Sequence, residues 1–178
     1  MRCAAPVDDL KLAGTLDPNR VHQFDRAADV RSFAVLVARG ARHQLMLSTR
    51  ELEFDLFDND EFIDAVKAVA LAGRNVCVRL LVDDIRVAVE RDHRLVQLAQ
   101  RLSSKIEVRR PNVEWSGSDR PALVLNDAGG WLKRNDPTRF DAEGALLDRP
   151  RQRELQLAFD RIWEHAEPET RIRLLKMS

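Results

Sequence analysis

The segment from Arg120 to Asp127 places a cation and a carboxylate at the two ends of a short apolar run. A guanidinium stays protonated and binds phosphate or carboxylate through forked N–H donors, but it cannot serve as a nucleophile or a general acid. Seven residues of strand at ~3.3 Å each separate the two ends by roughly 23 Å. We therefore expect Arg120 to lie at one edge of a sheet. Asp127 would lie at the opposite edge, as a carboxylate that stabilises the neighbouring Gly129–Gly130 turn.

Further polar side chains directly follow apolar runs that are typical of strands. In open α/β sheets, ligands gather beyond the carboxyl ends of the parallel strands. We expect this edge to collect the candidates for anion binding: Ser48, Arg50, Arg110, Arg120 and Arg134. The alternative is that arginine is simply abundant and that nearby carboxylates, Asp83, Asp84 and Glu143, neutralise these charges.

Two other sites are conceivable at the same edge. Asp83 and Asp84 are candidate Mg²⁺ ligands, although such pairs more often end a strand and cap the next turn. His93, near the start of a helix, is a candidate nucleophile because imidazole can attack phosphorus, and the alternative is an exposed or capping histidine. The four histidines lack metal-ligand spacing and no glycine-rich phosphate loop occurs, so we expect no cofactor.

Periodic apolar residues indicate the elements that must position these groups. Four helices are expected: one from Ala27, one opened by an Asp58–Glu61 capping box, one opened by Asp92 and one beginning near Asp148. The expected strands lie at 45–47, 75–82, 106–108, 123–126 and 131–133. This order predicts an α/β fold with a mixed sheet, in which the first three strands are parallel, an antiparallel hairpin follows, and helices cover both faces.

Length, charge and composition restrict the number of domains, the kind of partner and the cellular location that we expect. The 178 residues suit one domain, which we place at 23–178 behind a flexible tail, 1–22. The 29 basic and 29 acidic side chains cancel, so nucleic acid is not favoured as a partner, although it is not excluded. No apolar run approaches the ~20 residues of a membrane span, and two cysteines make no disulfide framework. We expect a cytoplasmic protein without membrane insertion.

The segment from Arg120 resembles the HxKxxxxD signature of the phospholipase D superfamily. Arg120 stands at the His position, Ala122 at the Lys position and Asp127 at the Asp position. The order of strands and helices is similar to a phospholipase D half-domain, and Phe159-Asp160 with Trp163 resembles its last helix. The chain looks still closer to a bacterial group of uncharacterised phospholipase D-like domains, found alone or behind an acetyltransferase-type domain. The resemblance covers about residues 25 to 175.

The resemblance implies that the known chemistry has been lost. The family's nucleophile is the His, which Arg120 cannot replace, and Ala122 has no charge. The family's Gly-Ser-x-Asn falls on Arg134-Asn135 and is absent. We therefore expect a degenerate, non-catalytic domain that binds an anionic, phosphate-containing ligand or a protein partner in an accessory or regulatory role.

Two alternatives stay open. One is a phosphodiesterase or phosphatidyltransferase that uses His93 as a relocated nucleophile. The other is a structural dimerisation module, because phospholipase D halves pair. The resemblance thus implies a homodimer, and an acetyltransferase-type partner is also implied by it.

Overall fold

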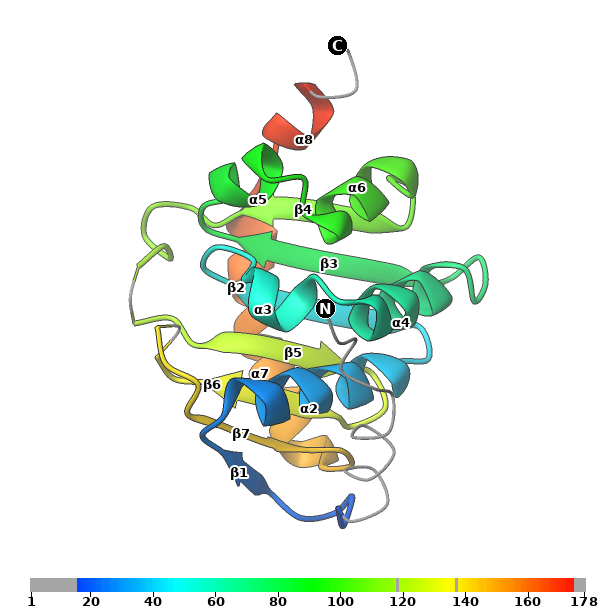
Figure 1. The fold of residues 1–178 in the computed structure, drawn as a ribbon, viewed down its shortest axis with the longest axis vertical. Coiled ribbons are helices and arrows are strands. Elements are labelled where there is room, and N and C mark those ends of the chain that lie inside the picture. Colours follow the sequence, from blue (N-terminus) through cyan, green and yellow to red (C-terminus); the bar gives the residue numbers. More distant parts are fainter. Residues whose placement is uncertain (1–15, 118, 137, 175–178) are drawn as a thin grey trace, which may run out of the picture.

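The strands of the molecule form one mixed sheet of eight (Figure 1). The computed structural model describes residues 16–117, 119–136 and 138–174. The strand order across the sheet is β1-β7-β6-β5-β2-β3-β4-β8. The strands are β1 (His22–Phe24), β2 (Gln44–Thr49), β3 (Cys77–Val82), β4 (Ile106–Arg110), β5 (Ala122–Asn126), β6 (Trp131–Arg134), β7 (Ala142–Ala145) and β8 (Glu167–Pro168).

The pairing directions confirm the predicted fold class. β2, β3 and β4 are parallel, and β5 runs antiparallel to β2 and forms an antiparallel hairpin with β6. Three strands were not predicted. β1 and β7 extend the sheet on one side, and β8 pairs with β4 on the other.

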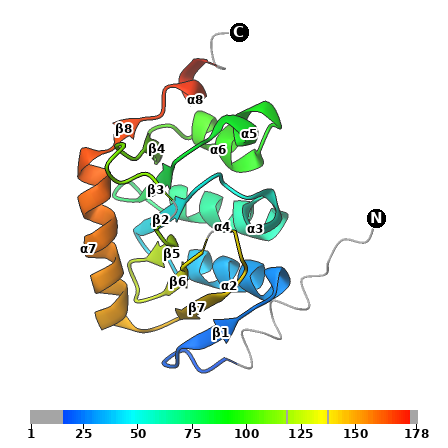
Figure 2. The same cartoon turned by 90° about the vertical axis from the view of Figure 1, so that its left-hand side faces the viewer.

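Helices cover both faces of the sheet, and they do so unequally. Figure 2 shows α7 alone on one face, where it runs from the β7 side of the sheet to β8. The opposite face carries the helices of the first half of the chain. These are α2 (Ala27–Arg39), α3 (Phe54–Phe57), α4 (Asp60–Ala70), α5 (Arg86–Glu90) and α6 (Arg94–Arg101), while α7 spans Arg149–His165 and α8 spans Arg171–Leu174.

The nearly unbroken apolar character of β3 reflects burial on both of its faces. Val78 and Leu80 belong to the larger core under α2 to α6, whereas Leu81 belongs to the smaller core under α7. The expected apolar face of α7 is confirmed, since Phe159 and Trp163 are buried in that smaller core.

Arg79 is a charged residue of β3 that points into the α7 side. Its Nη1 donates to Asp160 Oδ1 at 2.8 Å, and its guanidinium carbon lies 5.1 Å from the centre of the Phe159 ring and 5.6 Å from that of Trp163. Phe159, Asp160 and Trp163 of α7 therefore together bind one arginine side chain of β3.

Two predicted helix caps are wrong by one residue. Asn59, not Asp58, caps α4, and its side chain accepts from Phe62 N–H at 2.9 Å. His93, not Asp92, caps α6. Asp58 instead accepts a hydrogen bond at 2.5 Å from Arg94 Nε, which ties α4 to α6.

The β5–β6 turn depends on Asn126. Its Oδ1 accepts from the N–H groups of Ala128 and Gly130, both at 2.8 Å. A Cβ on Gly130 would lie 2.4 Å from Asn126 Nδ2, so glycine is required where this side chain folds over the turn.

The predicted tail, residues 1–22, lies outside the described residues as far as residue 15. Beyond that point the chain contacts the domain. Leu16 packs on the larger core, and the Pro18 carbonyl accepts from Leu147 N–H at 2.7 Å. None of the helices within the described ranges is long and apolar enough to cross a membrane.

Candidate functional site

The predicted site residues are carried by one edge of the sheet, which we call the carboxyl edge. It comprises the ends of β2, β3, β4 and β6 and the start of β5. The antiparallel register brings the elements together, because Ser48 of β2 pairs with Leu123 and Arg134 of β6 pairs with Ala122. The chain positions that sequence reasoning assigned to this edge are therefore at this edge.

Arg120 lies across the end of β2. Its Nη1 donates to Ser48 Oγ at 2.8 Å, and its Nη2 donates to the Asp83 carboxylate at the end of β3. The side chains of Arg120 and Asp83 are only 10% and 12% exposed. Burial lowers the pKa of Arg120 to about 10, which leaves the guanidinium charged at neutral pH, and the adjacent carboxylate favours that charge.

Arg134 is held in a second buried pair at the end of β6. Its Nη2 donates to Glu53 Oε1 at 2.5 Å, and Thr49 Oγ1 donates to Glu53 Oε2 at 2.6 Å. Glu53 thus joins the ends of β2 and β6 and compensates Arg134. Sequence reasoning missed this carboxylate, because nothing in the pattern of the β2–α3 connection indicates which way Glu53 points.

Arg50 and Arg110 differ from Arg120 and Arg134, which are both buried in ion pairs. Arg50 is exposed at the end of β2, and its side chain makes no hydrogen bond or ion pair with the described residues. Arg110 lies on the far side of the edge, where its Nη2 contacts Glu167 Oε2 of β8 at 3.3 Å. The structure brings Ser48 and Arg120 into contact, and Arg110 pairs elsewhere.

His93 is fully buried beneath the carboxyl edge. Its Nδ1 accepts from Leu95 N–H at 3.1 Å, as the cap of α6, and its ring packs on Phe54 with 4.6 Å between the ring centroids. Desolvation lowers the pKa of His93 to about 4, although the Asp58 carboxylate opposes the shift. The imidazole is therefore neutral, and the nitrogen lone pair that would attack phosphorus is used by the helix cap.

The two candidate metal ligands each face an arginine. Asp83 pairs with Arg120, and Asp84 Oδ2 accepts from Arg86 Nη2 at 2.6 Å. The hydrogen bond from Arg86 lowers the pKa of Asp84 to about 2. Within the described ranges, no three His, Cys, Asp or Glu side chains form a group that could hold a metal ion.

Asp127 lies at the opposite edge of the sheet. Its Oδ1 accepts from Arg42 N–H at 2.8 Å and its Oδ2 from His43 N–H at 3.0 Å. The carboxylate therefore fixes the start of β2, while Asn126 holds the turn that we expected Asp127 to stabilise.

Exposed apolar side chains lie on two loops at the carboxyl edge. Val113 and Trp115, in the loop from β4 to β5, are 84% and 40% exposed, and Phe140 is exposed in the loop from β6 to β7. Apolar residues inside otherwise polar loops were the available sequence signal. Contiguous exposed apolar surface is typical of sites that contact another protein, and these two loops are the candidates for it at this edge.

Comparison with protein families gives one match. The sequence model described as "Domain of unknown function (DUF7931)" matches residues 26–175. A search of the curated proteins finds no match.

Solved structures share the fold at low sequence identity. Nuc, a phospholipase D family member from Salmonella typhimurium, superposes with a TM-score of 0.60 at 11% identity, covering 84% of this chain and 97% of Nuc. NucT from Helicobacter pylori gives a TM-score of 0.57 at 11% identity, covering 84% and 99%. TrmBL2, a DNA-binding archaeal chromatin protein, gives 0.60 at 16% identity, covering 90% of this chain but 58% of TrmBL2. The chain therefore spans little more than half of TrmBL2, and these similarities establish a phospholipase D-like fold.

Proposed function

Because the chain belongs to the DUF7931 family and has a phospholipase D-like fold, we propose that it is a non-catalytic domain that binds a protein partner through its carboxyl edge. The partner presents an anionic group to Arg50, and the role of the domain is accessory or regulatory. The observation that carries the proposal is the position of Arg120. It stands where the family resemblance expects a nucleophilic histidine, and its guanidinium is bound by Ser48 and Asp83.

The groups at this edge support the proposed absence of catalysis. Phosphoryl transfer through a covalent intermediate needs a nucleophile that can lose or share a proton, and a guanidinium does neither. His93 is buried, and its Nδ1 accepts the bond that caps α6. Neither residue therefore presents a lone pair to a substrate.

The preference for a protein partner over a free anion follows from the remaining groups. Asp83 and Glu53 already compensate Arg120 and Arg134, so a small anion would meet two carboxylates beside its cations. Arg50 makes no ion pair with the described residues, and Val113 and Trp115 expose apolar surface on the β4–β5 loop of the same edge. An edge that offers both a charge and exposed apolar side chains suits contact with a protein surface.

Hydrolysis of bis-p-nitrophenyl phosphate tests the absence of catalysis. We expect the purified protein to release p-nitrophenol no faster than buffer does between pH 5 and 9. A rate that is present in the wild type and lost in Arg120→Ala or His93→Asn would refute the non-catalytic assignment.

Sedimentation and melting temperature test the binding part. The resemblance implies pairing of two copies, so self-association is measured for the wild type, Arg50→Glu and Trp115→Ser, with the exposed α7 variant Leu157→Ser as control. We expect the two edge variants alone to weaken association. In parallel, the melting temperature is followed with phosphate, sulfate, nucleotides and short oligonucleotides. A free ligand at 100 times its dissociation constant stabilises the folded protein by ~2.7 kcal/mol. A rise in melting temperature that corresponds to this stabilisation, with one of these compounds, would show that the site binds a small anion and not a protein partner.

A further inference from the structure

The edge of the sheet opposite the carboxyl edge is rich in cations, although the net charge of the chain is zero. We call it the amino edge, because β2, β3 and β4 begin there, and it lies on the right in Figure 1. It comprises the connections and adjoining helix turns at 16–21, 39–43, 67–76, 101–105, 127–130 and 146–154. These segments contain ten lysine and arginine residues but four aspartate and glutamate residues. The balanced charge of the chain is therefore distributed unevenly in space.

The four carboxylates of the amino edge are all engaged. Asp17, Asp127 and Asp148 accept hydrogen bonds from backbone N–H groups. Glu154 Oε2 pairs with Arg151 Nη1 at 2.8 Å. These acidic groups therefore leave most of the cations of this edge uncompensated.

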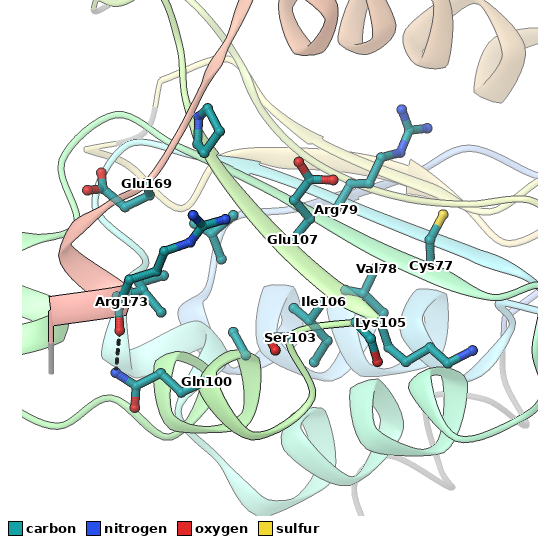
Figure 3. A pocket seen from close by; sticks show the side chains of 15 residues that line it. Cys77, Val78, Arg79, Gln100, Ser103, Lys105, Ile106, Glu107, Glu169 and Arg173 are labelled. Carbon is teal, nitrogen blue, oxygen red and sulfur yellow. Dashed lines mark hydrogen bonds between the residues drawn. The ribbon is translucent and has the colours of Figure 1, made fainter. Parts of the chain in front are cut away.

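The cations of the amino edge have few partners. Lys105 Nζ donates to the carbonyls of Gly73 and Arg74, both at 2.8 Å. Figure 3 shows its side chain extending away from the carboxylates of Glu107 and Glu169. The other eight cations, apart from Arg151, are exposed and their side chains make no hydrogen bond or ion pair with the described residues: Arg20, Arg39, Arg42, Lys67, Arg74, Arg101, Arg149 and Arg153.

Helix dipoles account for only three of these eight cations. Arg39, Lys67 and Arg101 lie in the last turns of α2, α4 and α6, where the partial negative charge of a helix end favours a cation. Arg149 and Arg153 lie in the first two turns of α7, where the dipole opposes them. They are also four residues apart, a spacing at which like charges destabilise a helix. A local cost without compensation in the described residues is typical of a binding site.

Arg149 and Arg153 border a cavity of about 310 Å³ between α7 and the start of β2. Two carboxylates also line this cavity, and both have partners. Asp127 accepts from backbone N–H groups, and Asp160 pairs with Arg79. The cavity therefore offers two guanidinium groups to an anion, and their forked donors match the oxygens of a phosphate.

The cations follow the amino edge as a row. In the order of the strands, the row consists of Arg20 before β1, Arg149 after β7, Arg42 before β2, Arg74 before β3 and Lys105 before β4. Six strand spacings of ~4.8 Å make the row about 29 Å long. This length is close to the ~34 Å of one helical turn of DNA, so the row suits a linear polyanion.

Exposed aromatic side chains of the described residues lie elsewhere. Trp115 and Phe140 are on loops of the carboxyl edge. Proteins that hold single-stranded nucleic acid stack its bases on such rings, whereas contact with the phosphates of a duplex needs none.

From the row of unpaired cations and the absence of stacking groups beside it, we propose that the amino edge binds the phosphate backbone of a nucleic acid duplex without sequence preference. Arg42, Arg74, Arg149 and Arg153 contact the phosphates. The carboxyl edge takes no part in this binding.

Fluorescence anisotropy of labelled DNA and RNA duplexes of about 20 base pairs tests the proposal. Four phosphate contacts predict a slope of about −3.6 for the logarithm of the association constant against that of the salt concentration. The affinity should therefore fall about 10²-fold between 50 and 200 mM salt. Binding of either duplex with this slope supports the proposal, and the tighter of the two identifies the nucleic acid.

Variants of single arginines locate the contact. Arg42→Ala and Arg74→Ala should each weaken binding and reduce the slope by about 0.9, as expected for the loss of one phosphate contact. Arg26→Ala is the matched control, because Arg26 is exposed and its side chain has no partner in the described residues, but it lies at the carboxyl edge. It should leave both the affinity and the slope unchanged. The melting temperatures of the free variants check that all of them fold.

The proposal is overturned if neither duplex binds at about 100 μM protein in 50 mM salt, or if Arg26→Ala weakens binding as much as Arg42→Ala does. Tighter binding of a single strand of the same length would also contradict it. Sedimentation with phosphatidylglycerol vesicles in the absence of duplex binding would assign the amino edge to an anionic membrane surface instead. Arg50→Glu leaves duplex binding unchanged. A rise in melting temperature with oligonucleotides that persists in Arg50→Glu and decreases in Arg42→Ala therefore belongs to the amino edge and leaves the proposed function untouched.

Discussion

The guanidinium of Arg120 and the carboxylate of Asp83 form an ion pair between β5 and β3, two strands that are separated in the sheet by β2. The pair closes over the end of β2, where Arg120 also binds Ser48 Oγ. Both side chains are close to nine-tenths buried. The Arg120 cation thus has a structural partner of its own.

Removal of one member of this pair is expected to destabilise the fold strongly. Arg120→Ala leaves Asp83 buried without its partner and should lower the free energy of unfolding by about 3–5 kcal/mol. Arg120→Met combined with Asp83→Leu removes both charges and should recover most of that loss. Urea denaturation measures both values. Arg110→Ala, which breaks an exposed pair with Glu167, is the control and should cost less than about 1 kcal/mol. Equal costs for Arg120→Ala and Arg110→Ala would show that the buried pair has no structural role.

His93 should make the stability of the protein depend on pH in the acid range. Its pKa in the folded state is about 4, below the ordinary 6.5, so the unfolded chain binds the proton first. The stability from His93 is complete above pH 6.5 and is lost as the pH falls through 4. The loss over this range is about 3 kcal/mol. His93→Asn keeps a capping side chain without a titrating ring and should lack this slope in urea unfolding curves between pH 7 and 4. A slope that is the same in the wild type and the variant would contradict the burial of His93.

Asp127→Asn is expected to weaken the start of β2. Burial opposes ionisation of Asp127, but hydrogen bonds from the backbone N–H groups of Arg42, Gln44 and His43 outweigh it and lower its pKa. The charged hydrogen bonds should contribute about 1.5–3 kcal/mol at neutral pH. Because the folded pKa is lowered, this contribution is present above the ordinary pKa and is lost as the pH falls through the folded value. The difference between wild type and variant should therefore shrink on acidification, as measured by urea unfolding at pH 7 and pH 3. Asp64→Asn changes an exposed carboxylate of α4 and serves as the control.

Arg79 should be difficult to replace even by lysine. Its guanidinium reaches Asp160 while lying near the rings of Phe159 and Trp163, and an ammonium cannot reproduce the planar contact. Arg79→Lys should lower the free energy of unfolding by about 1–3 kcal/mol, and the near-ultraviolet circular dichroism of Trp163 should change. Lys105→Arg, at a position that already binds two carbonyls, is the conservative comparison. A loss in Arg79→Lys no larger than in Lys105→Arg would mean that α7 recognises only the charge.

The elements with a long apolar pattern were predictable from the sequence. The strands at 77–82 and 122–126 and the helices α2 and α7 combine burial with a clear period, and they fix the order of the sheet. The elements that were missed are short. β1, β8 and α3 have two to four residues, so they carry no period, and their pairing depends on contacts with distant parts of the chain.

The location of the candidate site was predictable from the sequence, but the contacts between its side chains were less so. The rule for parallel strands brought Ser48, Asp83 and Arg120 to one edge, and these three residues are in contact there. Sequence spacing did not indicate the direction of each side chain. Glu53 therefore came as the unexpected partner of Arg134, and Arg110 turned out to pair with Glu167 on β8.

The course of α7 has a consequence for how the sheet comes apart. This helix begins just after β7, near one border of the sheet, and it delivers the chain to β8 at the other border (Figure 2). The helix therefore links the two outer parts of the sheet, β7 with β1 and β4 with β8, across the face that it covers. The strands at one border of the sheet therefore cannot separate from it without disturbing the strands at the other border. We expect amide exchange in the middle strands β2, β3 and β5 to proceed with one common free energy, that of complete unfolding.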